Sequence, residues 1–118
     1  MLRSITLLLL AAALSLPVAA RDVSKNALFG AIAYHAHSGS VGYAADRRNS
    51  RDARIEALRQ CGHPKCEVVA RLRNDCGALS KGAKKTVVER GATRQEAEAK
   101  ALRRCGEACA IVAWACTR

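Results

Sequence analysis

Two stretches of the chain repeat each other at a constant offset of 44 positions, and this repetition is the strongest constraint on the fold. The first stretch covers residues 49–62 and the second covers residues 93–106. Spacings of three and four residues between the shared apolar positions are typical of one stripe along a helix. The sequence therefore predicts two similar helices. Their shared positions are Ala53, Ala57 and Leu58 in the first stretch, matched by Ala97, Ala101 and Leu102 in the second.

Residues at both ends of the two stretches favour these boundaries. Thr93 followed by Glu96 forms a capping-box pattern, and Asn49 with Asp52 forms a weaker version of it. Each stretch ends on a cysteine followed by a glycine, and glycine is the residue at which a helix commonly stops.

The similarity extends to β-rich segments on both sides of each helix. Residues 66–73 and 109–116 follow the helices, and residues 29–33 and 76–80 open the two units. A turn at Ser38–Ser40 leads into a second strand at 41–44, and its equivalent covers 86–89. The chain is therefore predicted to consist of two units, at about 29–75 and 76–118, each with the order strand, strand, helix, strand.

Two such units are too few for a solenoid, so we expect them to pack together around a shared core. The expected fold class is α+β, with the two units packed as an antiparallel sheet covered by the two helices. The chain is 50% hydrophobic but only 3% aromatic, and many of its apolar residues are alanine. Because such a core buries little area, the domain needs covalent support.

Six cysteines are available to supply that support. An even number in an exported chain predicts three disulfides. The repetition favours one pairing, although six cysteines allow many others. Cys61–Cys66 and Cys105–Cys109 would each tie a helix to the strand that follows it. Cys76–Cys116 would join the first and last strands of the second unit.

The first twenty residues have the pattern of a secretory signal. Arg3 precedes a short apolar run at residues 5–16, Pro17 follows it, and small residues stand before a cleavage point after Ala20. The apolar run is too short to cross a hydrocarbon core of roughly 30 Å as a helix. We therefore expect a cleaved signal at 1–20, a single domain at 21–118, and a periplasmic or secreted protein. The alternative is an uncleaved anchor.

The chain resembles the bacterial family called domain of unknown function 4189. The resemblance covers nearly all of the chain that would remain after cleavage and includes all six cysteines. It implies an exported protein with one such domain behind a signal peptide, and it implies no catalytic residues. Members of the family often carry more aromatic residues before the second helix, whereas residues 84–90 here contain none. The matching elements are residues 29–34, the Ser38–Gly39 turn, Ala57–Leu58 with Cys61, Cys66, residues 74–79, residues 91–93, Glu96–Ala97, Ala101–Leu102, Cys105, Cys109 and Cys116.

Two chemical alternatives compete with a purely structural interpretation of the polar residues. Zinc could bind Cys61, His63 and Cys66 with a distant cysteine, or His35 and His37 could share a metal. Ser38 or Ser40 beside a histidine could form a hydrolytic pair, although serine next to glycine is more typical of a turn. No nucleophile elbow, phosphate loop or zinc-protease motif is present. We expect no metal, no cofactor and no catalytic residue.

The charge balance gives the best indication of function. The chain has 20 Lys and Arg against 10 Asp and Glu, a formal charge of +10, which favours binding to polyanions or acidic proteins. In the strand after the first helix, alternation predicts that Arg71 and Arg73 share one face. The repetition places Trp114 opposite Arg71, so these three residues would form a patch of the kind that interfaces favour. The alternative is that Trp114 belongs to the core. Further cations cluster at the start of the first helix at Arg47, Arg48 and Arg51.

The sequence thus predicts an exported, small, basic and disulfide-stabilised binding module that is not an enzyme. Its partner would be a polyanion or an acidic protein at the cell envelope or outside the cell. The alternatives are a small secreted hydrolase with a histidine-centred site and a structural component of the envelope.

Overall fold

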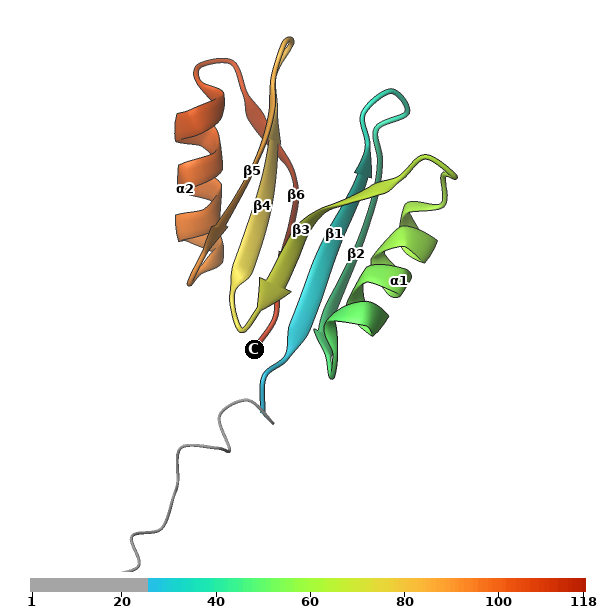
Figure 1. Ribbon diagram of the computed structural model, residues 1–118. Coiled ribbons are helices and arrows are strands. Elements are labelled where there is room, and N and C mark those ends of the chain that lie inside the picture. Colours follow the sequence, from blue (N-terminus) through green and yellow to red (C-terminus); the bar gives the residue numbers. More distant parts are fainter. Residues whose placement is uncertain (1–25) are drawn as a thin grey trace, which may run out of the picture.

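The computed structural model describes residues 26–118, so the predicted signal at 1–20 lies outside the described residues. The described chain forms six strands and two helices in the order expected for two tandem units (Figure 1). The first unit contains β1 (Phe29–His35), β2 (Ser40–Arg47), α1 (Ser50–Cys61) and β3 (Glu67–Arg73). The second contains β4 (Cys76–Lys81), β5 (Thr86–Gly91), α2 (Arg94–Cys105) and β6 (Ala110–Cys116). The α+β class and the tandem units are confirmed.

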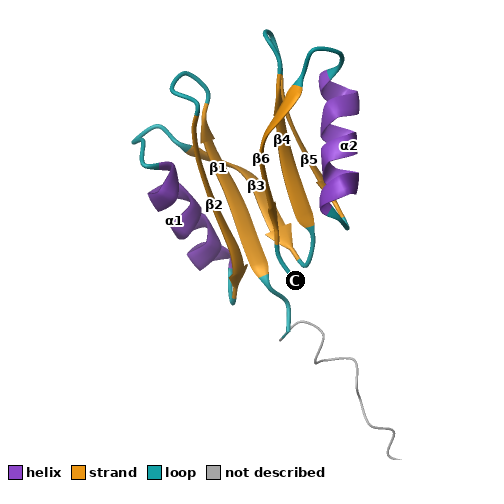
Figure 2. Ribbon diagram, turned by 180° about the vertical axis from the view of Figure 1, so that it is seen from behind, coloured by secondary structure: helices purple, strands orange, loops and turns teal. Residues whose placement is uncertain are grey.

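Each unit forms its own antiparallel sheet. This corrects the expectation of a single sheet for the whole chain. The strand orders are β2-β1-β3 and β5-β4-β6. In each sheet the first strand of the unit lies in the centre and already pairs on both sides. The link between β3 and β4 is only Asn74–Asp75, so the second sheet folds back over the first. The result is four layers, with the two sheets facing each other and one helix on each outer face (Figures 1 and 2).

Small side chains let each helix lie close to its sheet. Ala53 and Ala57 of α1 pack on Ala31, Ala33 and Ala44 of the first sheet. In the second unit, Ala97 and Ala101 of α2 pack on Cys76 and Ala78. Opposite α1 a glycine is required, because a Cβ at Gly42 would overlap the carbonyl oxygen of Ala57 and the backbone nitrogen of Cys61. The alanine stripes predicted from the sequence are thus the two helix–sheet contacts.

A third cluster holds the two sheets together. Ile32, Ala70 and Leu72 of the first sheet contact Ala115 of the second, and all four are buried. Val69 and Val88 are partly buried at the margin of this cluster. Because its buried members are few, cavities remain along both open edges of the sandwich.

The caps and disulfides agree with the sequence prediction. The side chain of Asn49 accepts a hydrogen bond from the backbone N–H of Asp52 at 2.8 Å, and Thr93 Oγ1 accepts one from Glu96 at 3.1 Å. Gly62 closes α1 in the left-handed region, with φ 69°. The three disulfides are Cys61–Cys66, Cys76–Cys116 and Cys105–Cys109, the pairing that the repetition favoured.

A β-bulge in β3 corrects one face assignment. The pairing of β1 with β3 shifts between Ile32 and Ala33, so that Ala70 and Val68 are consecutive partners and Val69 is the extra residue. Strict alternation would place Val69 on the same face as Arg71. Instead Val68 packs in the α1 cluster, and Val69 faces the other sheet. The sequence carries no visible signal of this extra residue.

Candidate functional site

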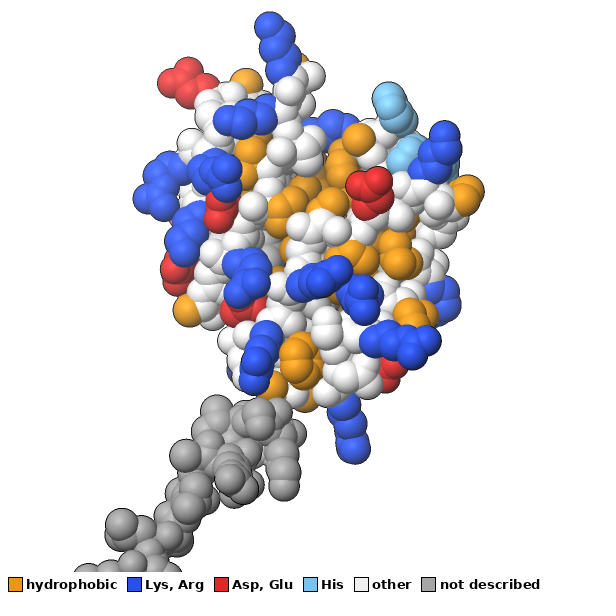
Figure 3. Space-filling model, viewed as in Figure 1, with side chains coloured by type: hydrophobic (Ala, Val, Ile, Leu, Met, Phe, Trp, Pro, Cys, Tyr) orange, Lys and Arg blue, Asp and Glu red, His pale blue; other side chains and the backbone are white. Residues whose placement is uncertain are grey.

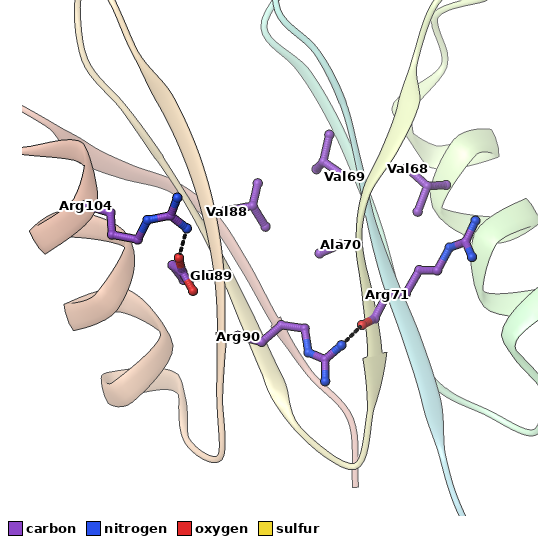
Figure 4. Close-up of a pocket in the computed structure, with 8 residues that line it drawn as sticks. All are labelled: Val68, Val69, Ala70, Arg71, Val88, Glu89, Arg90 and Arg104. Atoms are coloured by element: carbon purple, nitrogen blue, oxygen red, sulfur yellow. Dashed lines mark hydrogen bonds and ion pairs between the residues drawn. The ribbon is translucent and has the colours of Figure 1, made fainter.

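A groove opens between the two sheets along the edge strands β3 and β5. Its cavity is about 570 Å³. Val69, Ala70 and Val88 form the apolar floor, Arg90 and Arg104 extend from the second unit, and Arg71 presents its backbone carbonyl while its guanidinium lies on the side of α1 (Figure 4). The space-filling view shows apolar side chains in the middle of this face, with Lys and Arg side chains around them (Figure 3). The eight lining residues are Val68, Val69, Ala70, Arg71, Val88, Glu89, Arg90 and Arg104.

Two of the three arginines are held by acceptors of the protein itself. Arg90 Nε lies 2.8 Å from Asp75 Oδ2, and Arg90 Nη1 donates to the carbonyl oxygen of Arg71 at 3.3 Å. Arg104 of α2 pairs with Glu89 of β5, and the hydrogen bond from Arg104 lowers the pKa of the Glu89 carboxyl. Arg90 therefore links the two sheets across the groove, because it reaches from β5 to β3.

Arg71 and Arg73 lie on the face of the first sheet that α1 covers only in part. The guanidinium of Arg73 stands 5.8 Å from the centre of the Phe29 ring. Register places Arg47 on the other side of Phe29, so Arg47, Phe29 and Arg73 form a row across the sheet. Both Arg71 and Arg73 are exposed, and neither forms an ion pair with any residue of the described part, 26–118.

Arg54 of α1 adds a further cation on this side. Gln60 Oε1 accepts a hydrogen bond from the backbone N–H of Tyr43 at 3.4 Å, which places Gln60 on the flank of α1 that faces β2. Arg54 lies across the buried Ala53–Ala57 stripe from Gln60, on the flank that faces β3. Its Nε is buried and has no hydrogen-bond partner among the described residues. The basic character of this face therefore extends from the edge strand onto the helix.

The structure places Trp114 apart from Arg71 and Arg73, which corrects the predicted patch. Trp114 lies on β6, which contacts β1 and β2 across the sandwich, whereas β3 contacts β4 and β5. It is 40% exposed, so it is not a core residue either. The guanidinium of Arg94 stacks 3.8 Å from its ring centre. The division into two sheets separates these positions, which the repetition aligns.

The other arginines predicted for the binding patch lie in two separate places. Arg47 lies 3.9 Å from Glu56, and Arg51 is exposed on the first turn of α1. Arg48 lines a smaller cavity with Asn26, Ala27 and Leu28. The patch therefore consists of arginines around Phe29, with Arg48 and Arg51 at its margin.

The other open edge of the sandwich, between β2 and β6, is apolar. A cavity of about 490 Å³ is lined there by eight residues, none of them charged. Tyr43 is 53% exposed and Val112 is 45% exposed. The two edges of the molecule thus differ sharply in chemistry: one is basic and the other is uncharged. The lining consists of Val41, Tyr43, Ala45, Val112, Ala113, Trp114, Ala115 and Cys116.

The histidines gather at the tip of the β1–β2 hairpin. His35 and His63 stack with their ring centres 3.8 Å apart, and His37 lies 5.9 Å from His35. Burial lowers the pKa of His35 below its usual 6.5, and the neighbouring His63 and His37 lower it further. His35 Nδ1 lies 2.6 Å from Ser38 Oγ, which in turn donates to Ser40 Oγ at 2.9 Å.

These contacts organise a turn. The hydrogen bonds among His35, Ser38 and Ser40 join residues two or three positions apart in an exposed hairpin, as in the turns that serine favours. The zinc alternative is wrong for Cys61 and Cys66, because the two sulfurs are bonded to each other. Within residues 26–118, no group of three or more His, Cys, Asp or Glu is placed to hold a metal ion.

The structure brings together four groove residues that the sequence analysis did not single out: Val88, Glu89, Arg90 and Arg104. Glu89 and Arg90 are adjacent on β5 and follow Val87 and Val88, so the strand lacks the polar–apolar alternation that would mark its exposed face. Nothing in the sequence indicates that β5 lies beside β3, because that contact depends on the folding of one sheet over the other. Neither helix of residues 26–118 has the length and hydropathy of a membrane-spanning segment.

The fold and the groove define a class: a small, basic α+β sandwich, closed by three disulfides, with a cationic groove along one open edge. The chain belongs to the family described as domain of unknown function (DUF4189), whose match covers residues 29–116. It is also similar to a solved structure, the NMR structure of Rv1813c from Mycobacterium tuberculosis. The identity is 32%, the match covers 98% of this chain and 93% of that chain, and the TM-score is 0.62. No curated protein matches the chain.

Proposed function

We propose that the protein is a non-enzymatic binding module that acts outside the cytoplasm and holds an anionic partner on its basic edge. Three disulfides among residues 26–118 support this location, because such bonds persist in oxidising compartments. The formal charge of +10 supports an anionic partner, since a field of one sign attracts the opposite charge over the whole surface.

The observation that carries the proposal is the pair of free guanidinium groups on β3. Arg71 and Arg73 are exposed, and no carboxylate of the described chain neutralises them. A planar guanidinium presents parallel donors that match carboxylate, sulfate and phosphate groups. The two groups are two residues apart on the same face of the strand. This spacing suits a partner with repeated anionic groups.

Salt-dependent retention on heparin tests this proposal. We expect Arg71→Glu/Arg73→Glu to elute at clearly lower salt than the unmodified protein, because two contacts are lost and two repulsions added. Lys84→Glu/Arg103→Glu is a matched control: both residues are exposed, neither forms an ion pair within residues 26–118, and the net charge changes equally.

We expect the control to shift less than half as far as the edge variant. Equal shifts would mean that net charge alone governs retention, and the proposed site would be wrong. If the unmodified protein fails to bind heparin at physiological salt, the proposal of an anionic partner is wrong as a whole.

A further inference from the structure

We infer that the anionic partner is an extended acidic stretch of polypeptide, which joins the edge of β3 as an added β-strand. This inference rests on the proposed function, since it names the partner of the same basic edge. It assigns alternate side chains of the partner to two places. Apolar side chains would lie inward on the valine floor of the groove, and carboxylates would lie outward beside Arg71 and Arg73.

Within residues 26–118, β3 pairs with one neighbour only, β1. An edge strand presents a row of main-chain donors and acceptors, and an extended peptide can extend the sheet by pairing with them. The carbonyl of Arg71 is one such acceptor. It points away from β1, because Arg90 reaches it from the other sheet at 3.3 Å.

Side chains of the protein already occupy one end of this edge. In an antiparallel strand, the N–H and C=O of one residue point to the same side, and the side alternates along the strand. The N–H of Arg73 therefore lies on the side of the Arg71 carbonyl, and Asp75 Oδ1 accepts from it at 2.8 Å. No other side chain of residues 26–118 hydrogen-bonds to the backbone of β3, so the part of the edge around Val69 has no side-chain cover.

The two faces of an added strand would meet different chemistry. Beyond the bulge, Ala70 and Leu72 face the second sheet, whereas Arg71 lies on the face that α1 partly covers. Val69 also faces inward, toward Val88 (Figure 4). Since side chains of a strand alternate between faces, a peptide of alternating apolar and acidic residues satisfies both rows along Ala70–Arg73, where β3 itself alternates.

The groove itself shows how a carboxylate sits at this rim. Glu89 of β5 pairs with Arg104 on the α2 side of the second sheet, so a carboxylate and a guanidinium already meet at the outer margin of the groove. None of the eight lining residues is aromatic, and a binder of nucleic acid uses aromatic rings to stack bases. An apolar floor, an open strand edge and an arginine row therefore favour a peptide over a nucleic acid.

Binding of two synthetic peptides to the oxidised protein tests this inference. Both peptides contain about ten residues, half Glu and half Val; one alternates them and the other carries them in two blocks. We expect the alternating peptide to bind at least about tenfold more tightly, because only it can place all its carboxylates on one face. A further test is N-methylation of the backbone amides of every second residue of the alternating peptide, which keeps its charge but removes N–H groups that could pair with β3. Since only alternate N–H groups of an added strand point toward β3, we expect one of the two possible methylation patterns to weaken binding about tenfold.

A variant in the floor separates this inference from the proposed function. Val69→Thr keeps the side-chain shape and the net charge, so we expect weaker binding of the alternating peptide, by severalfold, with unchanged retention on heparin. Equal affinity for the two peptides, with heparin retention that still depends on Arg71 and Arg73, would overturn the inference and leave the proposed function standing. Heparin retention that does not depend on these arginines would overturn both.

Discussion

Glu56 on α1 shows how a single carboxylate contributes to the stability of this basic protein. Hydrogen bonds from Arg59 and Gln60 lower the pKa of Glu56 from 4.5 to about 2, and the nearby charge of Arg47 acts in the same direction. The group is thus stabilised in its charged form in the folded state. Within residues 26–118, the carboxylates that form ion pairs are those of Glu56, Asp75, Glu89, Glu96 and Glu98.

The lowered pKa of Glu56 predicts a pH dependence of stability. As the pH falls below about 4.5, the unfolded chain takes up a proton that the folded protein does not take up until about pH 2. The contribution of Glu56 is therefore complete above pH 4.5 and is lost as the pH falls toward 2.

Urea unfolding of the unmodified protein and of Glu56→Gln between pH 6 and pH 2 measures this effect. We expect the difference in stability between the two proteins to shrink as the pH falls through this range. Glu107→Gln serves as a control, because Glu107 is exposed and forms no ion pair within residues 26–118. A difference that stays constant down to pH 2 would contradict the assignment.

At the scale of elements, the three disulfides close loops of two different lengths. Cys61–Cys66 and Cys105–Cys109 close short loops, with sequence separations of 5 and 4. Each fixes the end of a helix against the start of the next strand. Cys76–Cys116 spans a separation of 40 and joins neighbouring strands of the second sheet, where the two residues are register partners.

Removing the long disulfide should therefore cost more than removing a short one. By the loop-entropy relation we expect a loss of about 4 kcal/mol for Cys76→Ala/Cys116→Ala and about 2 kcal/mol for Cys61→Ala/Cys66→Ala. Chemical unfolding of the two oxidised double variants gives both values. An equal or larger loss for the short-loop variant would mean that local helix anchoring, not restriction of the unfolded chain, dominates.

How far the elements could be predicted depended on the range of the interactions that define them. The helix stripes, their caps and the disulfide pairing follow from spacing within each unit, so Ala53, Thr93 and Cys61 could be placed from the sequence alone. The bulge at Val69 could not, because a strand with an extra residue has no distinctive composition. Strict alternation along the strand therefore puts Val69 on the wrong face.

For the whole molecule, the missing information was how one unit lies on the other. The sequence predicts two similar units and a shared core, but it does not say that each unit closes its own sheet. That arrangement sets Arg90 of β5 beside Arg71 of β3 and carries Trp114 to the opposite edge. The candidate groove is thus a product of tertiary packing, and among its arginines only Arg71 was predicted as a site residue.

The sandwich owes its stability to few bulky side chains. Between the sheets, the largest fully buried residues include Ile32, Leu72 and Leu79, and the helix contacts consist mainly of alanine. A core of this kind offers limited apolar area, and small domains with limited cores commonly depend on covalent links. The account therefore requires that the protein be oxidised where it acts.

Peptide mapping by mass spectrometry, without reduction, of protein taken from outside the cytoplasm tests that requirement most directly. The account predicts a chain without its first twenty residues, with no free thiol and with the pairs Cys61–Cys66, Cys76–Cys116 and Cys105–Cys109. Six free thiols in that material, or recovery of the protein only from the cytoplasm, would contradict it.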